Sequence, residues 1–302
     1  MLVGVLLLII TYFQFNTSLK TFISFKSKHT VTSSTRFSSS MDISPEKDHA
    51  MIPTYEMLAN RLLKRLEESS FEGGQLWVGI AGGPGAGKST LAEAVARRVN
   101  SLYFTSLSSS SSSSSSSASP SSPIAVVLPM DGFHFSRQQL REMAEKSNGL
   151  HTFDSLIARR GSPWTFDASA IVSSLSLAKE KGFGTLPTYS RKLSDPVPEG
   201  VVLLPTHRIV LVEGNYLLNW DDEEWSGLRN IFHEHWFLRC KSLEIQRERL
   251  IRRHLETWTA EKEKMWGSGE EGAARKADAN DVLNAEFVLA HEKYADLVIE
   301  SL

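Results

Sequence analysis

The chain has only one cysteine among its 302 residues, and its acidic and basic residues nearly balance. A single cysteine cannot form an internal disulfide, so Cys240 fits a reducing compartment, and its apolar neighbours predict a buried structural thiol rather than a nucleophile. The formal net charge of -2 provides no global basic field, so neither a nucleic acid nor a membrane partner has electrostatic support. We therefore expect a small-molecule partner.

Acidic residues are absent from residues 1–40, which are rich in Ser and Thr and contain several basic side chains. The apolar run at residues 2–10 is too short to cross a bilayer, which needs about 20 residues. It also lacks the basic leader and the small-residue cleavage site of a secretory signal. We expect residues 1–45 to be a disordered transit peptide for the chloroplast or mitochondrion. The alternative is a disordered tail on a cytoplasmic protein.

A serine tract interrupts the rest of the chain, with ten consecutive serines at residues 108–117. Such a composition cannot bury enough apolar surface to fold. We expect residues 106–122 to be a low-complexity insertion between a helix and the next strand, at residues 124–130. In a parallel α/β sheet such a loop lies at the N-terminal edge of the strands, whereas ligands bind beyond their C-terminal ends. The insertion should therefore point away from the active site.

The most informative motif runs from Gly82 to Ser89, where GGPGAGKS matches the phosphate-loop pattern GxxxxGKS. Glycines at 82, 83, 85 and 87 allow positive φ angles and turn backbone N–H groups toward a phosphate, and the next helix directs its N-terminus at the same anion. Lys88 can then reach the β- and γ-phosphates, and the Ser89 hydroxyl can coordinate Mg²⁺. The predicted cofactors are ATP and Mg²⁺, and the predicted nucleotide-binding residues are Gly82, Gly83, Pro84, Gly85, Ala86, Gly87, Lys88, Ser89 and Thr90.

Apolar and amphipathic segments alternate on both sides of this loop, with a strand expected at residues 75–81 and a helix at residues 91–99. Further strands are expected at residues 124–130, 209–213, 234–238 and 297–300, and further helices at residues 55–68, 168–179, 243–257 and 282–294. The alternation predicts an α/β fold of the P-loop NTPase type, a doubly wound, mostly parallel sheet flanked by helices, with a helical lid. We expect one domain over residues 50–302.

Two carboxylates stand where apolar strands end. Asp131 follows the segment VVLPM, so it should emerge near the phosphates, where a base orients and deprotonates an attacking hydroxyl. Capping the next helix, or holding Mg²⁺ through water, is the alternative. Glu213 closes the segment RIVLVE and is followed by Gly214, so it could bind Mg²⁺ through water. The alternative for Glu213 is a structural acid.

Two segments could contact a substrate. The segment ARRGSPWTFD at residues 158–167 contains Arg159, Arg160 and Asp167 in front of a helix, so Asp167 either binds substrate hydroxyls or caps that helix. PTYSRKLSDP at residues 187–196 predicts a proline-bounded loop that either lines a polar pocket or merely turns the chain.

Three arginines, Arg249, Arg252 and Arg253, are spaced to share one helical face. A closing helix that brings guanidinium groups to the γ-phosphate would stabilise phosphoryl transfer. The polar stretch at about residues 259–277 would be the flexible part of that lid. The alternative is a solvated face paired with nearby glutamates.

Five segments together resemble one family. GGPGAGKST, PMDGFH, RRGSPWTFD, and PTYSRKLSDP with VEGNYLL are similar to motifs of the phosphoribulokinase, uridine kinase and bacterial-type pantothenate kinase superfamily, from about residue 76 to the C-terminus. The resemblance implies an ATP-dependent kinase with an alcohol group as acceptor. It implies that Asp131 is the base, that Asp167 is a substrate-hydroxyl ligand and that Glu213 is a magnesium-site residue. It also implies that Arg252 or Arg253 is a lid arginine. The predicted catalytic residues are therefore Asp131, Lys88, Arg252 and Arg253.

Departures from the best-known relatives bear on the acceptor. Uridine kinases carry Asp-Ser-Phe-Tyr where this chain has Gly132 and His134 after the aspartate, and their histidine after Pro-Thr-Tyr is here Ser194. The Tyr-Ser-His of pantothenate kinases is here Tyr-Ser-Arg, ending in Arg191. The whole set is most similar to a branch of bacterial and fungal kinases that includes a sugar kinase of fructose type.

That branch implies a small sugar, polyol or acid as acceptor, bound by His134, Arg160, Asp167, Tyr189 and Arg191. A uridine or other nucleoside kinase and a pantothenate kinase are the alternatives. An alternative of another class is a nucleotide-binding regulatory P-loop protein without kinase activity. A homodimer also stays open, because one sequence does not specify the oligomeric state.

Overall fold

The computed structural model describes residues 45–68, 74–110 and 122–302. The described residues belong to the compact unit Ile43–Leu302. Residues 1–44 of the predicted transit peptide and residues 111–121 of the predicted insertion lie outside the described residues.

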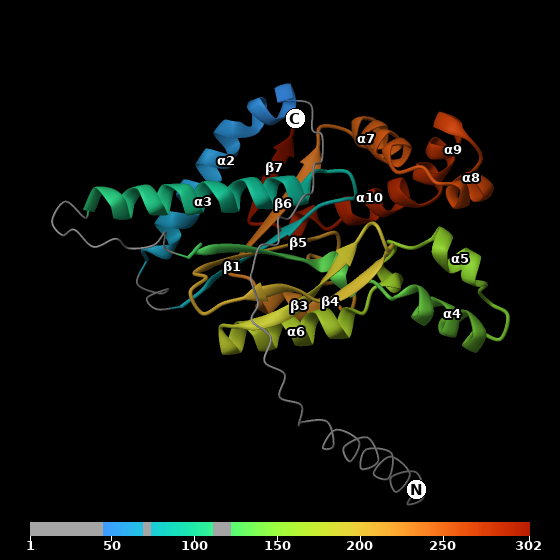
Figure 1. The fold of residues 1–302 in the computed structure, drawn as a ribbon, viewed down its shortest axis with the longest axis horizontal. Coiled ribbons are helices and arrows are strands. Elements are labelled where there is room, and N and C mark those ends of the chain that lie inside the picture. The colour runs from blue at the N-terminus through green and yellow to red at the C-terminus, as the bar shows by residue number, and fades with distance from the viewer. Residues whose placement is uncertain (1–44, 69–73, 111–121) are drawn as a thin grey trace, which may run out of the picture. The chain divides into compact units, whose positions relative to one another are not determined.

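A five-stranded sheet forms the centre of the unit, in the order β2-β5-β1-β6-β7 (Figure 1). Every pairing within it is parallel. Its strands are β1 (Leu76–Ala81), β2 (Ala125–Pro129), β5 (Ile209–Gly214), β6 (Glu234–Cys240) and β7 (Leu297–Ser301). The predicted α/β class and parallel sheet are therefore confirmed, with strand boundaries within two residues of the expected ones.

Helices cover both faces of this sheet. On one face, α2 (Pro45–Leu66) and α3 (Lys88–Ser110) pack against Leu76, Val78 and Ile80. On the other face, α6 (Ala168–Lys181) shares a core with Trp77. Side chains of a strand alternate between its two faces, so the near-continuous apolar run in β1 is buried on both. Both α2 and α3 are longer than predicted, and α3 continues into the first serines of the tract.

A two-stranded antiparallel hairpin, β3 (Gly184–Ser190) and β4 (Asp195–Leu203), lies beside α6. The predicted loop at residues 187–196 was therefore wrong, because both of its ends are strands and only the middle turns the chain. Proline is unfavourable inside a strand because it lacks the backbone N–H that donates to the neighbouring strand. Pro187 is tolerated here because it lies at a register shift between Leu186 and Thr188, where this donor is not needed.

Helices dominate the rest of the chain. They are α4 (Arg137–Lys146), α5 (Phe153–Ala158), α7 (Leu243–Glu256), α8 (Ala260–Trp266), α9 (Gly269–Lys276) and α10 (Val282–Leu289). A π-helical turn, Ala277–Asp281, joins α9 to α10. The predicted lid segment at residues 259–277 is thus mainly two short helices, and its flexibility stays a prediction. No helix in the described part of the chain is long and apolar enough to cross a membrane.

Strand register brings the predicted residues to one edge of the sheet. Glu213 in β5 lies opposite Ile80 of β1 and Pro129 of β2. The phosphate loop leaves β1 just after Ile80, and Asp131 follows Pro129 by two residues. Because all three strands are parallel, their C-terminal ends meet at this edge, where ligands bind in sheets of this type.

Candidate active site

The phosphate loop joins β1 to α3, which begins at Lys88. Gly85 and Gly87 have φ angles of 82° and 96°, a region that favours glycine. The positive φ predicted for Gly83 was wrong, and close packing explains this glycine instead. A Cβ there would lie 2.6 Å from Nε2 of Gln246, which donates to the Pro84 carbonyl at 2.7 Å. Gln246, a residue of α7 that the sequence did not single out, thus supports the loop from outside.

Lys88 is buried at the edge of the sheet, and its ammonium group is held in place. Its Nζ donates to the Gly83 carbonyl at 3.1 Å and to Oδ1 of Asn215 at 2.7 Å. Burial lowers the pKa of Lys88, against the opposing charges of Glu213 and Asp131. Asn215 was not predicted, although its place just beyond the β5 carboxylate was a usable signal.

The Ser89 hydroxyl donates to Oε1 of Glu213 at 3.1 Å. Glu213 is only 6% exposed, and burial together with the charge of Asp131 raises its pKa to about 7, although Lys88 and Ser89 act in the opposite direction. The raised pKa means that the negative charge of Glu213 is poorly stabilised in this structure, and a bound cation would stabilise it. Hydroxyl and carboxylate oxygens are also the ligands that Mg²⁺ prefers. The two side chains therefore fit the predicted magnesium site.

Asp131 lies in a short 3-10 turn, Met130–Phe133, immediately after β2. The structure does not support a role in capping the next helix, because Ser136 caps α4 in a reciprocal capping box with Gln139. Among the described residues, no hydrogen bond to the Asp131 carboxylate is found. Its charge acts on Lys88, Glu213, His134 and Arg253. The predicted base is thus half-buried, close to the predicted phosphate site and free to bind a hydroxyl.

His134 lies beside Asp131 and contacts two aromatic rings. Its ring centroid lies 3.9 Å from that of Phe166 and 5.1 Å from that of Tyr189. Burial lowers the pKa of His134, so the imidazole is neutral at pH 7. Its Nδ1 lies 2.8 Å from the Asp131 carbonyl oxygen, which can only accept, so Nδ1 carries the proton and Nε2 is an acceptor. No partner for Nε2 is present among the residues described.

Arg160, another predicted substrate ligand, is largely engaged within the protein. Its Nη2 donates to the Phe135 carbonyl at 2.7 Å and to Oδ1 of Asp195 at 2.9 Å. Its Nη1 donates to the Ser194 carbonyl, and its guanidinium lies over the Tyr189 ring. Arg160 therefore fixes the hairpin turn beside His134, and a direct substrate contact stays a prediction.

Asp167 caps α6, since its Oδ1 accepts from the Ala170 amide at 2.8 Å. The capping role that the sequence left open is therefore present. A substrate-hydroxyl role would fall to the other carboxylate oxygen and stays a prediction.

The three arginines of α7 have different environments. Arg249 donates to Ser301 Oγ and to the Leu302 carbonyl at the end of β7, so its guanidinium is engaged within the protein. Arg252 is exposed. Arg253 forms an ion pair with Asp281 at 3.8 Å, and its charge acts on Lys88. Of the two predicted lid arginines, the structure therefore favours Arg253.

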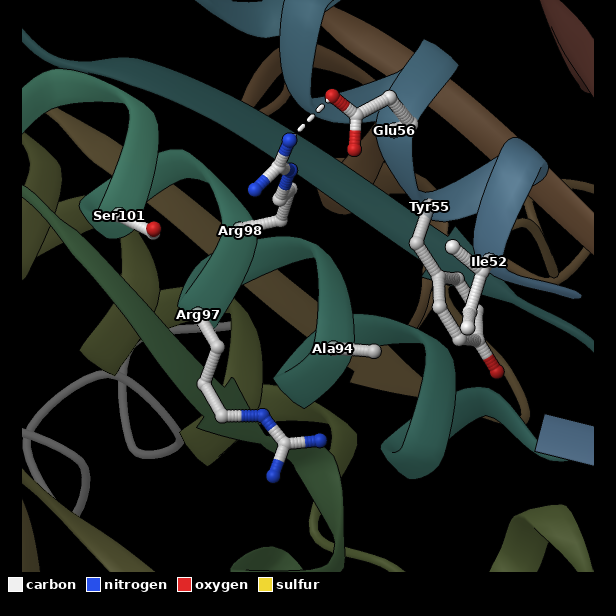
Figure 2. A pocket seen from close by; sticks show the side chains of 7 residues that line it. All are labelled: Ile52, Tyr55, Glu56, Ala94, Arg97, Arg98 and Ser101. Carbon is white, nitrogen blue, oxygen red and sulfur yellow. Dashed lines mark hydrogen bonds and ion pairs between the residues drawn. The ribbon is translucent and has the colours of Figure 1, made fainter. Parts of the chain in front are cut away.

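Arg191, at the exposed turn of the hairpin, also acts by its charge on Arg253. The hairpin turn and α7 thus approach the same region. A cavity of about 450 Å³ lies elsewhere, between α2 and α3 (Figure 2). Its lining includes the Arg98–Glu56 ion pair and Arg97 but none of the predicted site residues.

Comparisons with known proteins agree with this site. No protein-family model matches the chain. The chain is 29% identical over 255 residues to a Schizosaccharomyces pombe protein named "Putative uridine kinase", covering 83% of this chain and 92% of that protein. It is 31% identical over 131 residues to "ATP-dependent kinase-like protein notR'" of Aspergillus versicolor, covering 42% of this chain and 71% of that protein. The chain belongs to the P-loop kinases.

A kinase of known structure has a similar fold. The crystal structure of a "putative fructose transport system kinase" from Silicibacter sp. TM1040 matches with a TM-score of 0.60 at 25% identity, covering 81% of this chain and 98% of that chain. As a P-loop kinase, the protein is an ATP-dependent phosphotransferase, so the predicted superfamily, fold and enzyme class are confirmed. The roles assigned to individual residues stay predictions.

Proposed function

We propose that this P-loop kinase transfers the γ-phosphoryl group of ATP to a hydroxyl group of a small sugar, polyol or acid. The observation that carries the proposal is the Asp131 carboxylate, which has no hydrogen bond among the described residues and acts by its charge on the phosphate-loop lysine, Lys88. A base and a phosphate-binding cation at one sheet edge are what an in-line transfer to a hydroxyl requires.

In the proposed reaction, Asp131 orients the acceptor hydroxyl and accepts its proton as the oxygen attacks the γ-phosphorus. The bond between that phosphorus and the oxygen bridging it to the β-phosphate breaks, and ADP leaves. Lys88 offsets charge on the β- and γ-phosphates, and Arg253 offsets charge on the transferred group. Ser89 and Glu213 would hold Mg²⁺, which, when bound, offsets negative charge on the β- and γ-phosphates.

The hydrogen-bonding role of His134 supports a substrate that carries hydroxyl groups. Its Nε2 is an acceptor, so the substrate atom facing it has to offer a hydrogen. Burial raises the pKa of the neighbouring Tyr189, which keeps the phenol protonated and able both to donate and to accept. Sugars and polyols present such groups in abundance, and the name of the Silicibacter kinase refers to fructose.

A metabolite panel tests the proposal. ADP release by the full chain would be measured with MgATP alone and with fructose, glycerate, ribulose 5-phosphate, uridine or pantothenate. We expect one compound of the sugar, polyol or acid class to stimulate ADP release by the wild type and not by Asp131→Asn. Asp154→Asn, which changes an exposed aspartate of α5, serves as the matched control and should behave as the wild type.

Two other outcomes would contradict the proposal in different ways. Stimulation by uridine or pantothenate alone would replace the acceptor class with one of the named alternatives. ATP binding without stimulation by any compound would favour a regulatory P-loop protein.

We further propose, from the acid-free composition of the first forty residues, that residues 1–45 direct the protein to a chloroplast or mitochondrion. A fusion of these residues to a fluorescent reporter should enter one of these organelles. Diffuse cytosolic fluorescence would contradict the idea and favour the cytoplasm.

A further inference from the structure

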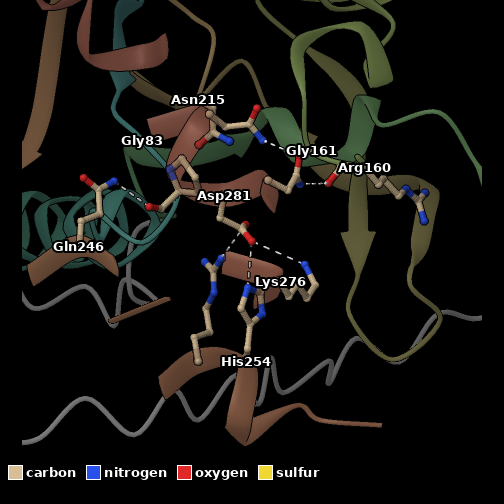
Figure 3. Close-up of polar contacts among 12 residues, drawn as sticks. Gly83, Arg160, Gly161, Asn215, Gln246, His254, Lys276 and Asp281 are labelled. Atoms are coloured by element: carbon tan, nitrogen blue, oxygen red, sulfur yellow. Dashed lines mark hydrogen bonds and ion pairs between the residues drawn. The ribbon is translucent and has the colours of Figure 1, made fainter. Parts of the chain in front are cut away.

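A buried carboxylate, Asp281, stands at the end of the π-helical turn with its two oxygens engaged separately (Figure 3). Its Oδ2 lies 2.9 Å from Nε2 of His254 and 3.6 Å from Nζ of Lys276. Its Oδ1 faces Nη2 of Arg253 at 3.8 Å. His254 and Lys276 thus anchor one oxygen, which fixes the direction in which the other meets Arg253.

The Asp281 carboxylate is charged at neutral pH. Burial raises its pKa, but the hydrogen bond from His254 and the charges of Lys276 and Arg253 act in the opposite direction, and the pKa falls to about 2. Burial lowers the pKa of His254, so its imidazole is neutral at pH 7 and donates through Nε2. The anion therefore keeps a net attraction for the guanidinium of Arg253.

The turn that carries Asp281 is itself attached to the segment at residues 159–162, which contains the predicted substrate ligand Arg160. Nη1 of Arg159 donates to the Ala279 carbonyl at 2.9 Å, and Nδ2 of Asn280 donates to the Arg160 carbonyl at 2.9 Å. Ser162 Oγ donates to Oδ1 of Asn280 at 3.2 Å. Such π-turns are rare and recur at functional sites. Here the turn contacts both the segment at residues 159–162 and the lid arginine.

We propose that Asp281 is the positioning residue of Arg253, holding its guanidinium group at the γ-phosphate from a turn that is fixed to residues 159–162. The inference rests on the proposed function, in which Arg253 offsets charge on the transferred group. Nη2 of Arg253 lies at ion-pair distance from Asp281, and within the described ranges no hydrogen bond from the Arg253 guanidinium is found, so its donors can bind phosphate oxygens.

This geometry has a consequence for nucleotide selectivity. ADP lacks the γ-phosphate, so Arg253, when held by Asp281, strengthens the binding of ATP more than that of ADP. A purely structural role of Asp281 would lower stability without changing this preference.

Calorimetric titration of the full chain with Mg-ADP and with a non-hydrolysable Mg-ATP analogue measures the preference directly. The measured ratio is the affinity for the Mg-ATP analogue divided by the affinity for Mg-ADP. We expect Asp281→Asn to lower this ratio roughly tenfold, as is common for coupled residues in contact. Arg253→Met should lower the ratio at least as much, and the double variant no further than Arg253→Met alone.

Asp278→Asn is the matched control. Asp278 pairs with Arg247, so this substitution removes a different ion pair between the same turn and α7. It should leave the ratio unchanged. If Asp281→Asn does not fold, Asp281→Glu keeps the charge on a longer side chain and should still lower the ratio by displacing the carboxylate.

The outcomes separate this inference from the proposed function. A lowered ratio in Arg253→Met with an unchanged ratio in the folded Asp281 variant would overturn the positioning role alone. An unchanged ratio in Arg253→Met, or an equal loss in Asp278→Asn, would overturn it as well. The proposed function is tested separately, by acceptor-dependent ADP release of the wild type, whose result does not depend on these affinity ratios.

Discussion

The hydroxyl of Ser89 lies 3.1 Å from Oε1 of Glu213 and ties the phosphate loop to the end of β5. The partner carboxylate titrates near neutrality, with a pKa raised from 4.5 to about 7. Because the folded state binds this proton more tightly than the unfolded chain, the contribution of Glu213 is fully favourable below pH 4.5 and is lost as the pH rises through 7.

Glu213→Gln should therefore raise the free energy of unfolding at pH 8 in the absence of nucleotide, by at most about 3 kcal/mol, and change it little near pH 4. The same variant should lose about a hundredfold or more in Mg²⁺-dependent turnover, since it removes a proposed metal ligand. Denaturant titrations at the two pH values check the first effect, with exposed Glu223→Gln as the control. Equal effects at both pH values would contradict the raised pKa.

Asn215→Leu should weaken MgATP binding about tenfold or more, because it removes the acceptor that holds the Lys88 ammonium in place. Calorimetric titration with a non-hydrolysable analogue measures this effect. Asn60→Ala, which removes an exposed side chain that donates to the Glu56 carbonyl of the same helix, should bind normally. Normal affinity in Asn215→Leu would show that Lys88 needs no support beyond the Gly83 carbonyl.

Gly132→Ala should destabilise the protein by about 1–3 kcal/mol and displace Asp131, since an added Cβ would lie 2.2 Å from the Pro187 carbonyl oxygen. The nearby atoms belong to the β3 backbone, which cannot move without shifting the hairpin. Thermal unfolding and turnover of the variant check both effects. Gly184→Ala in the same hairpin meets its nearest neighbour at 3.6 Å and should be nearly neutral. Full stability of Gly132→Ala would mean that the hairpin is not tightly seated.

Replacing residues 107–121 with a short Gly-Ser linker should leave kcat and KM within about twofold of the wild type. Asn100 Oδ1 accepts from the amides of Ile124 and Ala125, each at 2.9 Å, so the start of β2 is attached to α3 before the tract begins. This connection lies at the sheet edge opposite the phosphate loop. Steady-state kinetics check the replacement, and a large loss of turnover would mean that the tract reaches the active site.

Much of the site could be predicted because its residues follow local patterns. Lys88 belongs to a contiguous motif, and Asp131 and Glu213 each end an apolar run, so parallel strands alone bring them together. The fold class was predictable for the same reason, since apolar runs and helical periodicity alternate along the chain.

The missed residues act through contacts between distant segments. Gln246 supports the phosphate loop from α7, and Asp281, at the end of the π-helical turn, meets Arg253 of α7. Helical spacing alone could not distinguish Arg252 from Arg253, since the choice depends on what α7 packs against. The hairpin was missed because Pro187 sits at a register irregularity that its sequence context does not reveal.

The most direct test of phosphoryl transfer compares turnover and nucleotide affinity in Asp131→Asn. With the acceptor that the metabolite panel selects, ADP release should fall about a hundredfold to ten-thousandfold, the range for loss of a general base. The dissociation constant for the Mg-ATP analogue should stay near that of the wild type. Turnover that stays at the wild-type level in this variant would contradict the role of Asp131 as the base that deprotonates the acceptor hydroxyl.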